Sequence, residues 1–261
     1  MTAALSSLGK HLNLPFLISL AILAVIWEIA GRTADILTLP PITAVFASLW
    51  RLLSSGVLIA PLLDSTMALI TGLVISLLIG NIVGIAIGMS KICEVALGPF
   101  VKAGLSAPMI AFVPVFMMLF GIGPETRIAT VVAFSVFVVA TNAATAVRSA
   151  DPILLQMSYS FGANNRQMLS DIRLPAGAPY FLAGLRLGTA RGIKGLINGE
   201  VLIAVMGLGG LVKKYGTVFS MEALYAVILF ILLYAAVAIG VVGALGRLAF
   251  QQSHLSSGKR G

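Results

Sequence analysis

The chain has 261 residues, of which 59% are hydrophobic and only 10% are charged. Soluble domains average about 25% charged residues, so this composition excludes an ordinary soluble globular protein and indicates a polytopic membrane protein. The net charge of +8 comes from 17 basic and 9 acidic side chains, but no basic patch is interleaved with aromatic residues, so the sequence does not indicate nucleic-acid binding.

Six apolar windows predict six transmembrane helices, because about 20 apolar residues are needed to cross a bilayer. The windows are residues 14–30, 65–90, 103–124, 128–147, 179–206 and 223–246. The predicted fold class is therefore all-α. A shorter interfacial helix is predicted over residues 42–53, after the Pro40-Pro41 break. Its apolar stripe is expected to consist of Val45, Phe46, Leu49 and Leu53.

The basic residues predict how the six spans are oriented. With both termini in the cytoplasm, nine basic residues lie inside, five lie outside and three lie within the fifth span. The positive-inside rule favours this arrangement. The five on the outside are Arg32, Arg51, Arg127, Lys213 and Lys214. The loop 151–175 is then cytoplasmic.

Glycines recur on one face of the second span, at Gly80, Gly84 and Gly88. This spacing permits close approach of another helix, so the face is a candidate dimer seam. Glycine is also generally frequent in membrane helices, and that interpretation stays open beside the first.

Two prolines, Pro108 and Pro114, lie inside the third span. Each removes a backbone hydrogen bond and predicts a kink. The freed carbonyls require cover from protein or from a water-filled cavity, so we expect this helix to line a translocation path. The alternative is a kink without a role in the path.

The segment 151–175 is the one polar island in the apolar chain, and it predicts two short helices joined by a tight corner. Asp151 is expected to cap the first helix, with Pro152 at its first position. Leu154, Met157 and Phe161 recur at helical spacing and form an apolar face.

Gly162 fits a corner that requires positive φ, and Asn164 with Gln167 resembles a capping box that begins the second helix. That helix carries Met168, Leu169 and Ile172 and is predicted to end before Pro175. An amphipathic pair of this kind indicates a docking surface between two spans.

The fifth span is unusual because it carries charge: Arg191, Lys194 and Glu200 lie deep in it. A charged side chain near the bilayer centre costs about 2.5–3.5 kcal/mol on insertion scales, so it normally faces protein or water. Lys194 and Asn198 are i, i+4 neighbours and could receive an anionic substrate, although a buried ion pair is an equal alternative for Lys194. For Glu200 we expect a structural pair with a basic residue.

Gly162, followed after nine intervening residues by Ile172-x-Leu174-Pro175, resembles half of the EAA loop of permeases in ATP-binding-cassette (ABC) importers. The front of that motif differs, because Gln156-Met157-Ser158 stands in place of Glu-Ala-Ala. Leu39-Pro40-Pro41-x-x-x-Val45 resembles the segment before the transport core in the nitrate, sulfonate and taurine branch of these permeases. Segments that resemble the family in general are Ser106-Ala-Pro108, Phe120-Gly-Ile-Gly123, Gly184-Leu-Arg186 and Gly207-Leu-Gly209, and the resemblance covers about residues 39–248.

The resemblance implies a type I importer permease in the bacterial inner membrane, with no enzymatic activity and no cofactor in this chain. ATP and Mg²⁺ would bind two partner ATPase subunits, and a solute-binding protein would deliver a sulfonate, taurine, nitrate, bicarbonate or carboxylate anion. A second permease copy would complete a homodimer. The implied domains are 1–38 (tail and first helix), 39–248 (transport core) and 249–261 (C-terminal tail). Residues expected at the ATPase are Leu154, Met157, Phe161, Gly162, Met168, Leu169, Ile172, Leu174 and Pro175, and those expected along the path are Pro108, Pro114, Lys194 and Asn198.

Other classes of function were weighed against this one. A secondary transporter or channel for a small anion would need a repeat of the fifth span in the first half, and none is evident. An intramembrane enzyme or metal site would need clustered residues, whereas His11 and His254 lie near opposite termini and Cys93 is the only cysteine. The chain contains no GxxxxGK[ST] phosphate loop, so we expect ATP to bind elsewhere.

Overall fold

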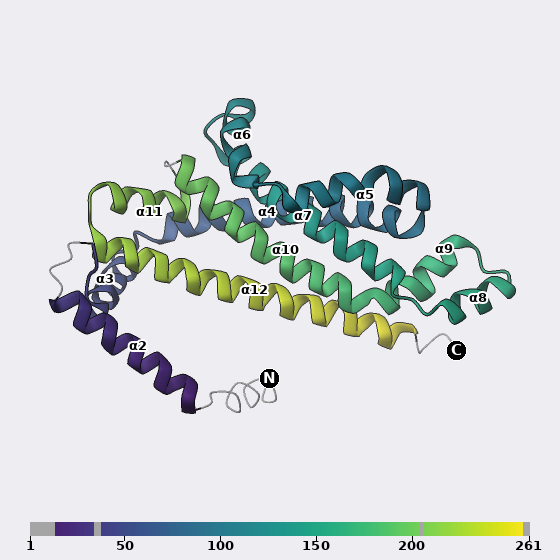
Figure 1. The fold of residues 1–261 in the computed structure, drawn as a ribbon, viewed down its shortest axis with the longest axis horizontal. Coiled ribbons are helices and arrows are strands. Elements are labelled where there is room, and N and C mark those ends of the chain that lie inside the picture. The colour runs from purple at the N-terminus through teal and green to yellow at the C-terminus, as the bar shows by residue number, and fades with distance from the viewer. Residues whose placement is uncertain (1–13, 34–37, 204–205, 258–261) are drawn as a thin grey trace. The chain divides into compact units, whose positions relative to one another are not determined.

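The computed structural model describes residues 14–33, 38–203 and 206–257, and within these ranges the chain is helical and contains no strand (Figure 1). The all-α prediction is confirmed. The longer helices are α2 (Leu14–Thr33), α3 (Ile42–Ser54), α4 (Ile59–Met89), α5 (Lys91–Ser106), α7 (Pro124–Arg148), α10 (Leu174–Ile203), α11 (Gly207–Thr217) and α12 (Met221–Ser257). The shorter elements are η1 (Met109–Phe112), α6 (Val113–Phe120), α8 (Pro152–Ser160), α9 (Asn165–Gln167) and η2 (Met168–Arg173).

Three helices in the described ranges, α4, α7 and α12, are long and apolar enough to cross a membrane. The number rises to five if each of two bent pairs is one span: α5 with η1 and α6, and the α9–α10 run with α11. Every window predicted from the sequence overlaps a helix, and the first window falls on α2. The count of six spans stays a prediction.

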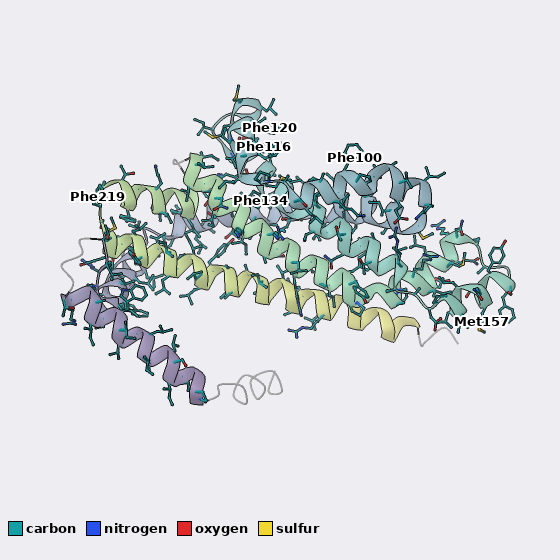
Figure 2. The ribbon with its side chains drawn as sticks, in the orientation of Figure 1. Phe100, Phe116, Phe120, Phe134, Met157 and Phe219 are labelled. Carbon is teal, nitrogen blue, oxygen red and sulfur yellow. The ribbon has the colours of Figure 1, made fainter. Side chains whose placement is uncertain are left out.

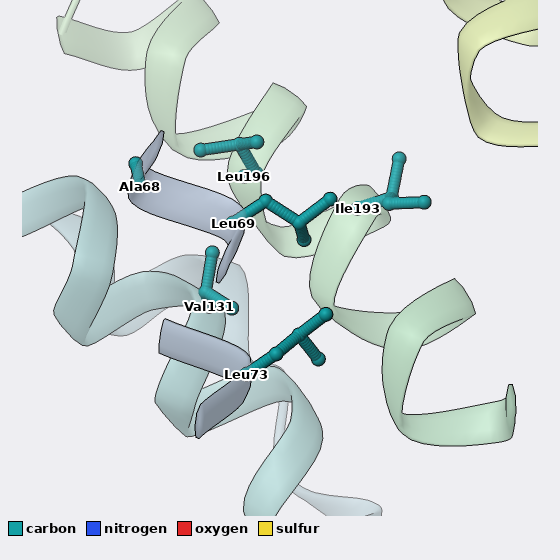
Figure 3. Packing of buried hydrophobic residues seen from close by; sticks show 6 residues of the cluster. All are labelled: Ala68, Leu69, Leu73, Val131, Ile193 and Leu196. Carbon is teal, nitrogen blue, oxygen red and sulfur yellow. The ribbon is translucent and has the colours of Figure 1, made fainter. Parts of the chain in front are cut away.

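The chain divides into two compact units, and the larger one holds residues 59–211 together with the chain from residue 231 onward. In this unit α4 and α10 both pack on α7, as the neighbouring ribbons in Figure 1 show. Its core cluster contains Leu73, Val131 and Leu196, one from each of these three helices (Figure 3). Half-buried residues of α12, among them Tyr234 and Ile239, complete this cluster.

Glycines of α4 meet α7 in a constant register. A Cβ added at Gly72 would lie 2.6 Å from the Val131 Cβ, and one added at Gly88 would lie 2.6 Å from the Val147 Cβ. The two numbers of each pair differ by 59, so α4 and α7 run parallel. The face containing Gly80, Gly84 and Gly88 is therefore occupied by α7 of the same chain, and its interpretation as a dimer seam was wrong.

Glycines of α10 meet α7 in the opposite direction. Gly177 lies against Ala146, Gly188 against Val139 and Gly199 against Thr130, so the number rises on one helix as it falls on the other. The two helices are therefore antiparallel. Both interfaces of α7 depend on glycine in the neighbouring helix, because any side chain there would overlap a packed residue or a backbone carbonyl.

The smaller unit contains α2, α3 and residues 212–230. Glu28 of α2 accepts from the Thr43 backbone N–H at 3.1 Å and so caps α3, whose preceding residue is a proline. The buried stripe of α3 differs from the prediction, because Phe46 and Leu53 are exposed. It consists of Val45, Ser48, Leu49 and Leu52.

Candidate functional site

The α8–α9 segment follows α7 directly, and its local chemistry confirms the predicted helix ends. Asp151 Oδ1 accepts from the Ile153 backbone N–H at 2.8 Å, and Pro152 occupies the first turn of α8. Gly162 has φ +82°, a conformation that glycine adopts without strain. This residue reverses the chain between α8 and α9.

The second helix of this segment begins as predicted but does not end where the sequence suggested. Asn164 and Gln167 form a reciprocal capping box, with both hydrogen bonds at 2.9 Å. From Met168 the chain forms the π-helical turn η2, and it then continues into α10. The predicted stop before Pro175 was therefore wrong: the Leu174 N–H donates to the Leu169 carbonyl, and Pro175 lies in the first turn of α10.

The two halves of the segment differ in exposure. In α8 and the residue after it, Leu154, Met157 and Phe161 are more than half exposed, and Phe161 is 85% exposed. Figure 2 shows Met157 in α8, at the end of the helical bundle where this segment lies. In contrast, Met168 is buried. The remaining members of the predicted docking set, Leu169, Ile172 and Leu174, are half-buried, and Pro175 is exposed.

The third predicted span is broken rather than merely kinked. Between α5 and the η1–α6 segment the chain turns by 94°, and Pro108 lies in the break itself. Pro114 lies in the first turn of α6, where its missing N–H costs nothing, so the predicted kink at Pro114 was wrong. In Figure 2, the labelled residues Phe116 and Phe120 lie on α6, which projects from the other helices.

Three polar side chains share one open face of α10. Arg191 and Lys194 are exposed and Asn198 is half-buried, whereas the residues between them on the other faces are mostly buried. Leu187 and Leu202, both about half exposed, continue the same face at either end. We call Arg191, Lys194 and Asn198 the α10 polar face.

Arg191 also lines a small pocket of about 60 Å³ at the break in the third span. The other lining residues come from the break, such as Ala107 and Met109, and from α7, such as Phe134. The sequence singled out Lys194, but the structure brings Arg191 to the Pro108 break. In the sequence, the i, i+3 spacing of Arg191 and Lys194 already indicates that both cations share one helix face.

A buried polar cluster lies near the C-terminal end of α10, beside Glu200. Glu200 is fully buried, and its Oε1 accepts from the Ser65 hydroxyl at 2.7 Å and lies 3.6 Å from Arg127 Nη1. Its Oε2 accepts from the Gly209 backbone N–H at 2.9 Å, while the Leu208 N–H donates to Ser65 Oγ at 2.9 Å. Glu200 and Ser65 thus satisfy the orphan N–H groups at the start of α11.

The predicted pairing of Glu200 with a basic residue is confirmed, and its partner is Arg127. The sequence placed Arg127 on the outer side, which stays a prediction; the structure adds that its side chain is buried in the first turn of α7. A buried carboxylate in a membrane helix requires a counter-charge. Glu200 therefore predicts that the side chain of one basic residue near the end of a span points into the protein.

Metal binding has no candidate among the residues that the structure describes, since they contain no group of three or more His, Cys, Asp or Glu side chains. Cys93 is a half-buried free thiol near the start of α5.

The sequence pattern of one family matches residues 76–251, which include α7, the α8–α9 segment and α10. The family is described as the binding-protein-dependent transport system inner membrane component. This chain belongs to that family. Together with the apolar helices, this membership identifies the chain as a permease of an ABC importer in the inner membrane and favours that function over a secondary transporter, channel or enzyme.

Individual relatives agree with this assignment. The taurine transport system permease protein TauC of Escherichia coli is 30% identical over 80% of this permease and 78% of its own length. The riboflavin transport system permease protein RibX of Chloroflexus aurantiacus is 28% identical over 91% and 88%. The putative aliphatic sulfonates transport permease protein SsuC of Bacillus subtilis is 26% identical over 72% and 69%.

Proposed function

We propose that this permease carries a small anionic solute across the inner membrane, in a cycle driven by ATP hydrolysis on partner subunits. The observation that carries the proposal is the α10 polar face, where Arg191 and Lys194 are exposed and Asn198 is half-buried on one side of the helix. Charged groups facing lipid would cost several kcal/mol, so this face requires water or another protein surface. A water-filled path along it would attract anions.

The path proposed here runs beside the break in the third span. Pro108 leaves backbone groups free at the bend, and Arg191 lines the pocket next to it. Lys194 and Asn198 continue along α10, one turn apart. An oxyanion could exchange its hydration shell for the hydrogen-bond donors of Arg191, Lys194 and Asn198 in succession. We assign Pro114, in the first turn of α6, to the same path.

The substrate class is argued from this charge and from the relatives. Two relatives are named for taurine and for aliphatic sulfonates, which carry a sulfonate group. Others are named for riboflavin and formylaminopyrimidine. The two cations of the α10 polar face favour the sulfonate, nitrate, bicarbonate and carboxylate class for this permease.

Coupling to the ATPase is assigned to the α8–α9 segment. Leu154, Met157 and Phe161 form an exposed apolar surface at the end of the bundle, and such anchors contribute most of the energy of protein interfaces. The half-buried Leu169, Ile172 and Leu174 would transmit movement of α8 into α10, because η2 joins α10 without a loop. ATP and Mg²⁺ would bind only the two partner subunits.

The complete transporter proposed here contains two copies of this permease, two ATPase subunits and an extracytoplasmic solute-binding protein. Both termini would be cytoplasmic, the same side as α8. Residues 39–248 would form the transport core, with residues 1–38 and 249–261 outside it.

A matched pair of substitutions tests the coupling assignment. Phe161→Ala and Phe100→Ala each remove an exposed phenyl group, 85% and 74% exposed respectively, but only Phe161 belongs to the proposed docking surface. We expect Phe161→Ala to reduce co-purification of the partner ATPase about thirtyfold, the equivalent of a 2 kcal/mol anchor. Phe100→Ala should leave it unchanged. Equal retention of ATPase by both variants would refute the assignment, and a wild-type chain that never binds an ATPase would refute the importer function.

A further inference from the structure

A pocket of about 430 Å³ lies between α4, α5 and α7. It is near the end of the larger unit where α8 begins, because Arg148, the last residue of α7, lines it together with Lys91, the first residue of α5. This pocket shares no lining residue with the α10 polar face. It shares only Leu105 with the small pocket beside Arg191, so most of it lies outside the proposed transport path.

The charges in this pocket are predominantly positive. Lys91, Lys102 and Arg148 line it, and Glu94 is the one acidic lining residue. Glu94 is shared by two of the cations: its Oε2 lies 2.9 Å from Lys91 Nζ and its Oε1 lies 3.2 Å from Arg148 Nη1. Among the described side chains, Lys102 has no ion-pair partner, so the pocket has an excess of positive charge.

The remaining wall of the pocket is mainly apolar. It includes Ile87 of α4, Val95 and Leu105 of α5, and Ala144 of α7. Val95 is 68% exposed, and Phe100 on the same helix points outward from the bundle (Figure 2). The pocket thus has Lys91 and Arg148 at one end and Lys102 eleven residues further along α5, with apolar wall between them.

We propose that this pocket binds the phosphate headgroup of an anionic membrane lipid. Basic pockets between transmembrane helices at the cytoplasmic side are suited to such headgroups, since the phosphate meets the cations while the acyl chains lie along apolar helix surface. Lys102 supplies a point charge, and Arg148 supplies a planar fork that matches phosphate oxygens. The Arg148 Nη2 group already donates to the Ile87 carbonyl at 2.8 Å, which holds the guanidinium in the pocket.

Glu94, unlike the cations of the pocket, is expected to weaken lipid binding. Its carboxylate occupies the position between Lys91 and Arg148 that a phosphate would take, so it competes with the lipid. Neutralising Glu94 should strengthen lipid binding, whereas neutralising Lys102 should weaken it. Simple structural damage would weaken binding in both variants, so the two effects can be distinguished.

Native mass spectrometry of the full-length chain in detergent measures the binding directly. The probes are phosphatidylglycerol and phosphatidylethanolamine with identical acyl chains. We expect wild type to retain phosphatidylglycerol preferentially, Lys102→Gln to lower that preference about fivefold and Glu94→Gln to raise it by a similar factor. Lys213→Gln removes an exposed lysine of α11, outside the pocket, and should change nothing. Equal preference in Lys102→Gln and Lys213→Gln would overturn the proposal.

Competition with inorganic phosphate separates a lipid from a free anion. Retained phosphatidylglycerol in excess phosphate supports the lipid, because the acyl chains add contacts that the free ion lacks. Complete displacement in wild type would assign the pocket to small soluble oxyanions and overturn the lipid assignment. This readout does not depend on transport, so it stands apart from the function proposed above.

Discussion

Glu200 Oε1 and Arg127 Nη1 lie 3.6 Å apart in the interface between α10 and α7, and both side chains are almost fully buried. Among the residues that the structure describes, the Nε and Nη1 atoms of Arg127 find no hydrogen-bond partner, so Glu200 supplies the main compensation for a buried cation. The same carboxylate accepts from the Gly209 N–H. One side chain therefore stabilises both the α7–α10 contact and the start of α11.

Removal of the charge on Glu200 should be strongly destabilising. In Glu200→Gln the Arg127 guanidinium stays buried without a counter-charge, a change that typically costs about 3–5 kcal/mol. Thermal unfolding in detergent measures the loss. Glu222→Gln is the control, because the Glu222–Arg51 pair at 3.0 Å is solvent-exposed and contributes about 0–1 kcal/mol. Similar stability of the two variants would contradict this account of the buried pair.

The contact of Gly84 with α7 predicts that two Gly→Ala substitutions have different effects on stability. A Cβ at Gly84 would overlap the Ala140 carbonyl oxygen and lie 2.6 Å from the Ala143 Cβ, whereas a Cβ added at Gly240 of α12 would meet no atom of the described residues within 4 Å. Gly84→Ala should therefore cost about 1–3 kcal/mol through overpacking. Gly240→Ala should be neutral or stabilising by up to about 1 kcal/mol, since alanine favours a helix. Thermal unfolding of both variants, which make the same chemical change, checks the prediction.

The positive φ of Gly162 predicts a local effect at the α8–α9 corner. Gly162→Ala places a Cβ in a left-handed conformation, which costs roughly 1–2 kcal/mol. Hydrogen exchange should quicken in residues 152–167, while the core amides of α7 stay protected. Gly216→Ala is a suitable control because Gly216 has no positive φ and, within the part of the chain that the structure describes, no atom lies within 4 Å of an added Cβ. Unchanged exchange at the corner would show that the strain is absorbed elsewhere.

The α10 polar face predicts how uptake depends on charge. Arg191→Met and Lys194→Met keep an unbranched, flexible side chain, somewhat shorter than the original, but remove a charge-assisted contact, which typically contributes about 1.5–3 kcal/mol. We expect the KM for uptake of a sulfonate or other anionic substrate to rise about tenfold or more. Lys214→Met removes an exposed cation of α11 and should leave KM unchanged. Uptake that is insensitive to both α10 substitutions would refute the proposed path.

The sequence alone determined the features whose causes are local. The Asp151 cap, the Asn164–Gln167 capping box and the positive φ of Gly162 each depend on residues a few positions apart, and all three are confirmed. Apolar windows of sufficient length likewise placed the helices, because hydrophobicity is a property of composition.

Only the tertiary structure decided features that depend on distant residues. The Gly80–Gly84–Gly88 face is compatible with any close-packing helix, and only the fold shows that α7 occupies it. The hydropathy of a segment cannot reveal that Arg127 turns inward to Glu200, 73 positions away. Local propensity favoured a stop before Pro175, but continuous packing of η2 and α10 on α7 outweighed the loss of one hydrogen bond. Pairing between distant segments is set by the free energy of the whole bundle, which no short stretch of sequence contains.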